Sequence, residues 1–357
     1  MTLAISHLVP LAPRTTLGLG GAARFFVEAE SPADLVSALR WAGERALPIF
    51  VLGGGSNLVV GDDGFSGLVI HPTSSGQSWT ETDARLTVDV QAGEPWDHVV
   101  VESTRRGVFG IECLSGIPGS TGAAPVQNIG AYGQEVADVI DCVRVLDRGS
   151  LEVLDIDSRA CGFGYRDSLF KREPDRFIIL CISMAFRRAA RLVLRHAELA
   201  SVLATQSKPS PAQVREAVLA LRWNKSMVFD PSDENRHSAG SFFTNPIVDA
   251  GAAERIVTRA LASGVVTAPD QVPRFPRPDG RVKLAAGWLI ERSGLGKGFR
   301  MGPVGISTRH ALALVHHGGG TTADLLRLAL HVRKVVLDQF DVVLTPEPVF
   351  LGVDWPT

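Results

Sequence analysis

A long segment that is rich in glycine and proline and carries no charge constrains the fold of this chain more than any other feature. It runs from Cys113 to Gln134 and contains five glycines and two prolines. The segment is long enough to cross a bilayer, but a membrane helix needs a continuous apolar run, which these residues interrupt. We therefore expect a long loop rather than a membrane span, and loops of this length are usually functional or disordered.

Two features favour an ordered binding loop over a disordered one. Apolar side chains such as Ile117 and Tyr132 give the segment its own anchors against a planar ligand. A second, shorter glycine-rich turn with the sequence GGGSN follows the apolar strand expected at 49–52. Glycine lacks a Cβ, so the backbone N–H groups of such turns can approach a diphosphate closely. The short turn alone is equally consistent with a plain tight turn, but two such loops in one domain predict a bound dinucleotide.

Elsewhere the chain alternates short helices and short strands, which is typical of an α+β enzyme. Helical spacing of apolar residues predicts helices at 31–48, 94–107, 211–223, 252–264, 283–294 and 321–340. Alternating or fully apolar runs predict strands at 49–52, 58–60, 68–70, 86–93, 139–149, 151–157, 177–186, 310–315 and 342–352. A chain of 357 residues is expected to form two or three domains. The KPSP cluster predicts a boundary near Ser210.

Charge and cysteine content argue against several classes of protein. The net charge is -2, with both signs interspersed and no dense run of Lys or Arg, so neither nucleic acid nor a membrane is an expected partner. The four cysteines form no CxxC pair and the nine histidines form no HxxxH or HExxH motif. We therefore expect neither disulfides nor a metal site. The N-terminus lacks the basic region of a secretory signal, so a cytoplasmic protein is expected.

Several basic residues are candidates for catalysis or phosphate binding, and each can also be explained by a structural role or by exposure to solvent. Arg166 in YRDSLFK could act on a substrate, but a structural salt bridge with Asp167 explains it more simply. Arg222 and Lys225 in RWNK are three residues apart, so they could clamp a phosphate or form a solvated basic face.

Further candidates follow in the C-terminal third. Ser241 stands between Gly240 and two phenylalanines in GSFFTNP, where most serines are turn residues. Lys283 lies at the start of an expected helix. Glu347 lies between two prolines in an expected strand, where its backbone has little freedom, although proline-flanked glutamates are commonly turn residues.

The order of these motifs resembles the UDP-N-acetylenolpyruvoylglucosamine reductase family. The likeness runs from about Thr15 to Gly352 and is carried by GGGSN, SGIPGSTGAAPVQNIGAYG, YRDSLFK, RWNK, GSFFTNP, VKLAAGWLIE and a PE pair near the C-terminus. One such match could arise by chance, whereas seven in order leave little room for chance.

The resemblance implies an α+β fold with an FAD-binding domain of the vanillyl-alcohol-oxidase (PCMH) type and an α+β substrate-binding domain. It places the FAD-binding domain at 1–218, as two α+β subdomains at about 1–70 and 71–218, and the substrate-binding domain at 219–357. It implies a UDP-N-acetylmuramate dehydrogenase, which reduces UDP-N-acetylglucosamine enolpyruvate with NADPH and bound FAD in peptidoglycan synthesis. A monomer is expected.

The resemblance also assigns roles to individual residues. The catalytic arginine falls on Arg166, the proton-donating serine on Ser241 and the catalytic glutamate on Glu347. The substrate-binding residues are Tyr165, Arg222, Lys225, Asn245 and Lys283. The cofactor-binding residues lie in the two glycine-rich loops and are Gly53, Gly54, Gly55, Ser56, Asn57, Ser115, Gly116, Ile117, Pro118, Gly119, Ser120, Gly122, Asn128, Ile129, Gly130, Ala131, Tyr132 and Gly133.

The chain departs from the family pattern at a few positions. Many relatives carry substrate-clasping tyrosines where this chain has Phe275 and His196, and many carry arginine where it has Val349. Another FAD oxidoreductase of the same cofactor fold, such as a sugar or lactone oxidase, would keep the glycine-rich loops but leave Lys225 and Ser241 without a role. A non-catalytic nucleotide-binding module would show no redox turnover.

Overall fold

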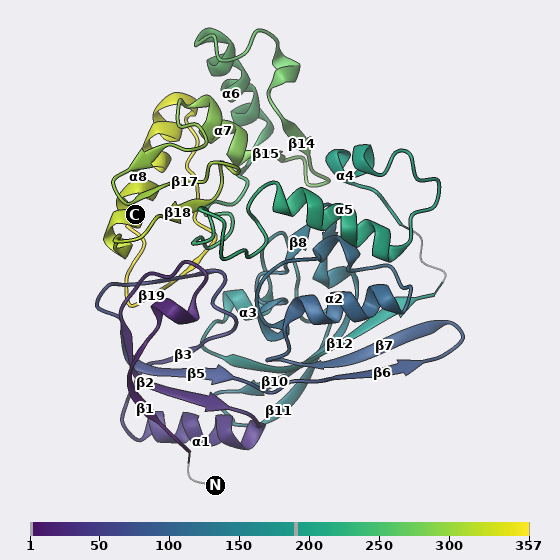
Figure 1. The fold of residues 1–357 in the computed structure, drawn as a ribbon, viewed down its shortest axis with the longest axis vertical. Coiled ribbons are helices and arrows are strands. Elements are labelled where there is room, and N and C mark those ends of the chain that lie inside the picture. Colours follow the sequence, from purple (N-terminus) through teal and green to yellow (C-terminus); the bar gives the residue numbers. More distant parts are fainter. Residues whose placement is uncertain (1–2, 189–191, 357) are drawn as a thin grey trace. The chain divides into compact units, whose positions relative to one another are not determined.

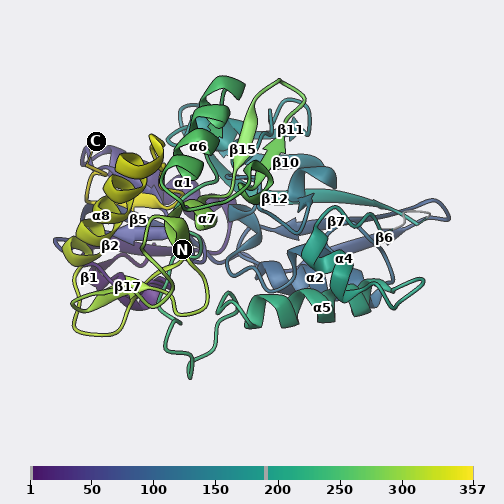
Figure 2. The same cartoon turned by 90° about the horizontal axis from the view of Figure 1, so that it is seen from above.

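The structure is a computed structural model that describes residues 3–188 and 192–356. It mixes helices and strands along the whole described chain (Figures 1 and 2), which confirms the α+β class predicted from the sequence. The chain forms two compact units, and each takes more than one segment of sequence. The first unit comprises Met1–Val9, Ala23–Gly55 and Ser66–Phe229, and the second comprises Pro10–Ala22, Ser56–Phe65 and Asp230–Thr357.

The first unit contains two main sheets. One has the strand order β1-β2-β5-β3 and consists of β1 (Ser6–Pro10), β2 (Ala22–Ala29), β5 (Phe65–Pro72) and β3 (Ile49–Val51). The other is antiparallel, has the order β11-β10-β12-β7-β6 and consists of β11 (Val153–Asp157), β10 (Ile140–Asp147), β12 (Phe177–Arg187), β7 (Arg85–Gln91) and β6 (Gln77–Glu81). A short hairpin joins β8 (Gly130–Ala131) to β9 (Gln134–Glu135). The helices are α1 (Pro32–Gly43), α2 (Trp96–Arg105), α3 (Leu169–Arg172), α4 (Ala197–Val202) and α5 (Pro211–Trp223).

Local sequence explains the best-defined elements of this unit. α1 begins at a capping box, in which the Ser31 side chain accepts from the Asp34 N–H and the Asp34 carboxylate accepts from the Ser31 N–H. Its buried residues are Leu35, Ala38, Leu39 and Ala42, the spacing of one helix face. β7 alternates buried and less buried residues, as expected for a strand with one face in the core.

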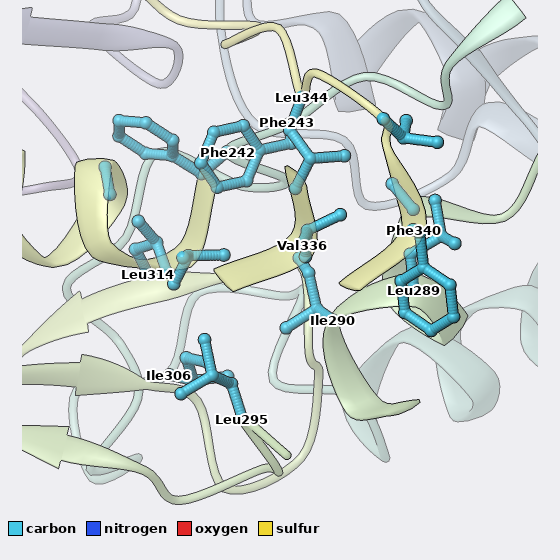
Figure 3. Packing of buried hydrophobic residues seen from close by; sticks show 14 of the residues in the cluster. Phe242, Phe243, Leu289, Ile290, Leu295, Ile306, Leu314, Val336, Phe340 and Leu344 are labelled. Atoms are coloured by element: carbon cyan, nitrogen blue, oxygen red, sulfur yellow. The ribbon is translucent and has the colours of Figure 1, made fainter. Parts of the chain in front are cut away.

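In the part of the chain that the structure describes, the second unit contains small sheets and three α-helices. The strands are β13 (Ile247–Val248), β15 (Val282–Leu284) and β14 (Arg274–Pro276) in one sheet, β16 (Arg300–Met301), β17 (Val304–Ile306) and β18 (Leu314–His316) in another, and the parallel pair β4 (Leu58–Val60) and β19 (Val349–Leu351). The helices are α6 (Ala250–Ala262), α7 (Ala286–Arg292) and α8 (Thr322–Phe340). Their apolar faces form one core, in which Phe242 and Phe243 lie beside Leu344 (Figure 3).

Three sequence predictions need correction. The helix expected at 283–294 begins only at Ala286, because Lys283 pairs in β15 with residues of both neighbouring strands. The strand expected at 342–352 is reduced to β19, since prolines at two positions cannot donate to a strand ladder. Ser210 is not a linker residue but the N-cap of α5, inside the first unit. The assignment of FAD binding to 1–218 and of substrate binding to 219–357 stays a prediction.

Candidate active site

The two glycine-rich loops meet in the first unit. A Cβ added to Gly54 would lie 2.5 Å from Gly119 Cα, and one added to Gly53 would lie 2.8 Å from Ser120 Oγ. Real Cβ atoms do not approach backbone this closely, so only glycine fits at Gly54 while Gly119 stays in place. Gly119 itself has φ +125°, a conformation that other residues rarely adopt. The sequence predicted two separate loops for one dinucleotide, and the structure brings them into contact.

Backbone donors are available in the shorter loop. Among the described residues, no protein acceptor takes a hydrogen bond from the N–H of Gly53, Gly54 or Gly55. Gly55 is nonetheless buried. Buried backbone donors are almost always paired in proteins, so the unpaired N–H of Gly55 indicates a place where a ligand accepts it. Gly53 is half-buried and Gly54 is exposed, so their N–H groups are open to the same ligand. A phosphate is the ligand that such a row of N–H groups fits best.

Buried hydrogen bonds fix the longer loop. Glu112 is fully buried and accepts from the Gly110 N–H at 2.6 Å and from Gln134 Nε2 at 2.6 Å. The Gln134 side chain in turn accepts from the Cys113 N–H at 2.9 Å. Burial raises the pKa of the Glu112 carboxyl above its usual range. The apolar anchors expected from the sequence pack into the protein, with Ile129 9% exposed.

Arg166 is tied to the longer loop by its guanidinium group. Its Nη2 donates to the Gly130 carbonyl at 2.8 Å and its Nη1 to the Asn128 carbonyl at 3.3 Å. Asp167, which the sequence offered as its salt-bridge partner, pairs with Arg172 instead. Arg166 is half-buried and its guanidinium carbon lies 5.6 Å from the ring centre of Tyr165. The predicted catalytic arginine and a predicted substrate-binding tyrosine therefore lie together at the edge of the predicted flavin loop.

Arg222 and Lys225 have different surroundings, although the sequence grouped them. Arg222 is 7% exposed, and its Nη2 donates to the carbonyls of Met227 at 2.7 Å and Gly116 at 3.2 Å. Arg222 thus supports the backbone of the longer glycine-rich loop. Lys225 is partly exposed, and its Nζ lies 2.5 Å from Glu198 Oε2 of α4.

An aromatic pair flanks Lys225. The rings of Tyr132 and His196 meet edge to face at 5.0 Å, and Lys225 Nζ lies 5.8 Å from the Tyr132 ring centre. Burial raises the pKa of Tyr132 to about 12 and lowers the pKa of His196, so both rings are neutral near pH 7. His196 therefore contacts Tyr132, which in turn lies beside a predicted substrate-binding lysine.

The second unit holds the remaining catalytic candidates. The backbone N–H of Glu347 donates to the Phe242 carbonyl at 2.8 Å, and its carbonyl accepts from Asn57 Nδ2 at 3.2 Å. The Asn57 carbonyl accepts from the Val349 N–H at 3.0 Å. Glu347 lies just before β19, so Asn57, the serine segment and the PE pair meet in this unit. Ser241 Oγ lies 3.5 Å from Nε2 of His310.

The other substrate candidates lie around β15. The Asn245 side chain accepts from the Ala286 N–H at 2.9 Å, which caps the start of α7. Lys283 Nζ lies 5.8 Å from the ring centre of Phe275. That ring is 50% exposed, which fits a residue at a ligand-facing surface better than one in the core. Ile247, two residues after Asn245, pairs with Lys283 between β13 and β15.

Two residues with close contacts to the site were missed by sequence reasoning. Glu198 pairs with Lys225 over 27 positions, and His310 contacts Ser241 over 69 positions. Neither separation has a local pattern that could reveal it. Within the described ranges, no three His, Cys, Asp or Glu side chains are placed to hold a metal ion, and none of the described helices has the length and hydropathy of a membrane span.

Comparison with known proteins finds two family domains and close full-length relatives. Residues 23–155 match the family model described as FAD binding domain, and residues 230–351 match the C-terminal domain of UDP-N-acetylenolpyruvoylglucosamine reductase. The second match begins where the second unit's longest segment begins. The chain is 46% identical over 358 residues to the reductase of Thermobifida fusca, covering 99% of both chains. It is 48% identical over 350 residues to that of Salinispora arenicola, covering 96% of this chain and 94% of the relative.

A solved structure agrees with these matches. The UDP-N-acetylenolpyruvylglucosamine reductase of Thermus caldophilus superposes with a TM-score of 0.63 at 25% identity, covering 98% of this chain and 99% of that one. The glycine-rich loops and the FAD-domain match define an FAD-dependent oxidoreductase. Because the chain is more than 40% identical to the reductases of Thermobifida fusca and Salinispora arenicola over nearly its full length, it belongs to the UDP-N-acetylenolpyruvoylglucosamine reductase family. The family predicted from motif order is confirmed.

Proposed function

We infer that this chain reduces UDP-N-acetylglucosamine enolpyruvate to UDP-N-acetylmuramate, with NADPH as reductant and FAD as cofactor, in the synthesis of peptidoglycan precursors. The observation that carries the proposal is full-length identity to reductases of this name. Free cysteines fit a reducing compartment, so we place the enzyme in the cytoplasm, and we expect it to act as a monomer.

The reaction sets three tasks for the protein. A hydride adds to the vinyl CH₂ carbon, and a proton adds to the neighbouring carbon, which carries the carboxylate. Bound FAD supplies the hydride chemistry. The chain must hold the substrate, offset the negative charge that develops on the carboxylate side and deliver one proton.

The first unit offers the cofactor site and one catalytic cation. The N–H groups of Gly53, Gly54 and Gly55 would hold the diphosphate of FAD, and the segment 115–133 would hold the rest of the dinucleotide. Arg166, already fixed by the Gly130 carbonyl, would offset charge on the substrate carboxylate. Loss of one such donor typically slows catalysis by about 10²–10³-fold.

The second unit supplies the proton and the glutamate. Ser241 would donate its hydroxyl proton to the carbon beside the carboxylate, because that carbanion is more basic than the alkoxide left behind. Glu347 is the other catalytic candidate in this unit. Its backbone is held at both ends of the peptide, by Phe242 and by Asn57, which fixes where the side chain begins.

Four side chains are candidates for holding the UDP-sugar directly. Lys225 and Lys283 are the candidates for its phosphates, and Asn245 and Tyr165 are candidates for its other polar groups. Arg222 would act indirectly, through the Gly116 carbonyl that it supports. The two lysines differ in surroundings, since one is paired with Glu198 and the other lies near the Phe275 ring.

Anaerobic stopped-flow mixing tests the proposal by following flavin absorbance in two stages. NADPH should bleach the flavin, and UDP-N-acetylglucosamine enolpyruvate should then restore its colour. Ser241→Ala should leave the first stage nearly intact and slow the second by at least about 10²-fold, the low end for general acid catalysis. Ser241→Cys should recover part of the rate. A protein that contains no flavin, or whose reduced flavin is reoxidised by oxygen but not by the enolpyruvyl substrate, would refute the proposed reaction.

A further inference from the structure

A histidine ring lies beside Ser241 in the second unit. Ser241 Oγ and His310 Nε2 are 3.5 Å apart. Hydrogen bonds in catalytic sites are often long before substrate binds and shorten in the complex. The imidazole nitrogen is therefore within reach of the hydroxyl group to which the proposed function assigns the proton transfer.

The backbone holds both members of this pair in place. The N–H of Phe242, which follows Ser241, donates to the Leu312 carbonyl at 2.7 Å. Leu312 lies in the turn between β17 and β18, which also carries His310. The N–H of His310 donates to Ser307 Oγ at 3.3 Å, and Ser307 is fully buried. The serine segment and the histidine turn are thus joined by a short hydrogen bond one residue from Ser241 and two residues from His310.

After Ser241 donates its proton, a neighbouring group must reprotonate it. Once the hydroxyl has given up its proton, it is a strongly basic alkoxide at the edge of an apolar core. Phe242 and Phe243, the next two residues, are each 1% exposed, so little water is available from that side. An unpaired charge in such surroundings is costly. Histidine is the side chain best suited to carry a proton to it near neutral pH.

We propose that His310 restores the proton of Ser241 during the reduction, a role that rests on the proposed function. The Oγ–H bond of Ser241 breaks, and its proton forms the new C–H bond on the substrate carbon beside the carboxylate. The Nε2–H bond of the His310 imidazolium breaks in the same step, and that proton forms the new Oγ–H bond. The imidazole becomes neutral and regains a proton from water. His310 contacts the serine rather than the substrate, so it is a positioning and proton-supplying residue.

Variants at both positions test the inference through the reoxidation stage. His310→Gln keeps a hydrogen-bond donor but cannot release a proton, so reoxidation by the enolpyruvyl substrate should slow by about 10-fold or more. Reduction by NADPH should be unchanged. The Ser241→Ala/His310→Gln double variant should be no slower than Ser241→Ala, because residues that act in one chain have non-additive effects. His317→Gln, a variant of another histidine in the same unit, is the matched control and should react at the normal rate.

Chemical rescue separates proton supply from a structural role. Added imidazole should restore part of the reoxidation rate of His310→Ala but none of the rate of Ser241→Ala/His310→Ala. Flavin content and the urea midpoint of unfolding show that each variant folds. A normal rate in His310→Gln, additive slowing in the double variant or no recovery with imidazole would each overturn the role of His310. A normal rate in Ser241→Ala would instead overturn the role of Ser241 in the proposed function.

Discussion

Glu198 is the residue whose removal tests the substrate role of Lys225 most directly. The Lys225 ammonium group lies 2.5 Å from the Glu198 carboxylate, and the two side chains are 32% and 40% exposed. If Lys225 holds a phosphate of the UDP-sugar, the substrate must replace Glu198 at this ammonium group. Glu198→Gln removes the competing charge and keeps the size of the side chain. We therefore expect this variant to have a lower KM for the UDP-sugar.

The exposure of the pair sets the size of the effect. Solvent-exposed ion pairs contribute about 0.2–1 kcal/mol, because water and salt screen them. A pair that is about one-third exposed should lie in the upper part of that range, at about 0.5–1 kcal/mol. A tenfold change in an equilibrium constant corresponds to about 1.4 kcal/mol, so KM should fall about 2- to 5-fold. High salt screens the pair and should shrink the difference between variant and parent.

Steady-state kinetics at saturating NADPH, at low and at high salt, measure this change. Asp155→Asn is the matched control, because it removes a carboxylate from an exposed ion pair with Arg144 in the same unit. Its KM should equal that of the parent. Lys225→Ala should raise KM and leave flavin content unchanged. A Glu198→Gln variant whose KM is unchanged or higher at low salt would refute the competition between Glu198 and substrate.

Three further predictions follow from the contacts above. Gly54→Val should lower the flavin content of the purified protein, since its Cβ would lie 2.5 Å from the opposite loop, whereas a larger residue at Gly43, which has nothing within 4 Å, should not. Lys283→Ala should raise KM for the UDP-sugar with normal flavin absorbance, and loss of flavin would contradict its assignment to substrate. Burial, together with the nearby His237 ring, lowers the pKa of His316 in the folded chain. Between that pKa and about 6.5 the unfolded chain binds more protons, so the free energy of unfolding should fall as pH decreases. His316→Asn should flatten this slope in urea titrations by up to about 1.4 kcal/mol per pH unit, and an unchanged slope would assign the titration to other groups.

Local signals made much of the fold predictable. α1 and α8 both begin at capping boxes and present apolar residues at helical spacing, so sequence alone located them. β12 was likewise predicted from a local signal, its continuous apolar run. The sheet of β13, β14 and β15 was missed, because its strands are only two or three residues long and Val248 pairs with Val282, 34 positions further along the chain. Nothing in such short segments distinguishes a strand from a loop.

For the candidate site too, local motifs predicted residues, whereas contacts from distant segments could not be predicted. Motif order proposes Arg166, Ser241 and Glu347 as catalytic residues. His310, which contacts Ser241, comes from a distant segment and has no motif of its own. Arg222 is different, because the sequence held a signal that was not used. Val214 and Val218 are buried on α5, and Arg222 continues this four-residue spacing, so helical periodicity already placed it on the buried face.

The longer glycine-rich loop has a strained backbone that surrounding contacts hold in a fixed geometry. Three residues other than glycine, Asn128, Tyr132 and Arg166, have φ values of 44°, 49° and 52° in or beside it. Each such conformation costs on the order of 1–3 kcal/mol and persists only where surrounding contacts enforce it. The Asn128 side chain makes three hydrogen bonds, to Glu135, to the Gly164 carbonyl and from the Ala137 N–H. These bonds and those of Arg166 hold a loop that apolar packing alone would leave free to relax. The strain thus lies where the proposed reaction needs an arginine and a flavin loop at one fixed separation.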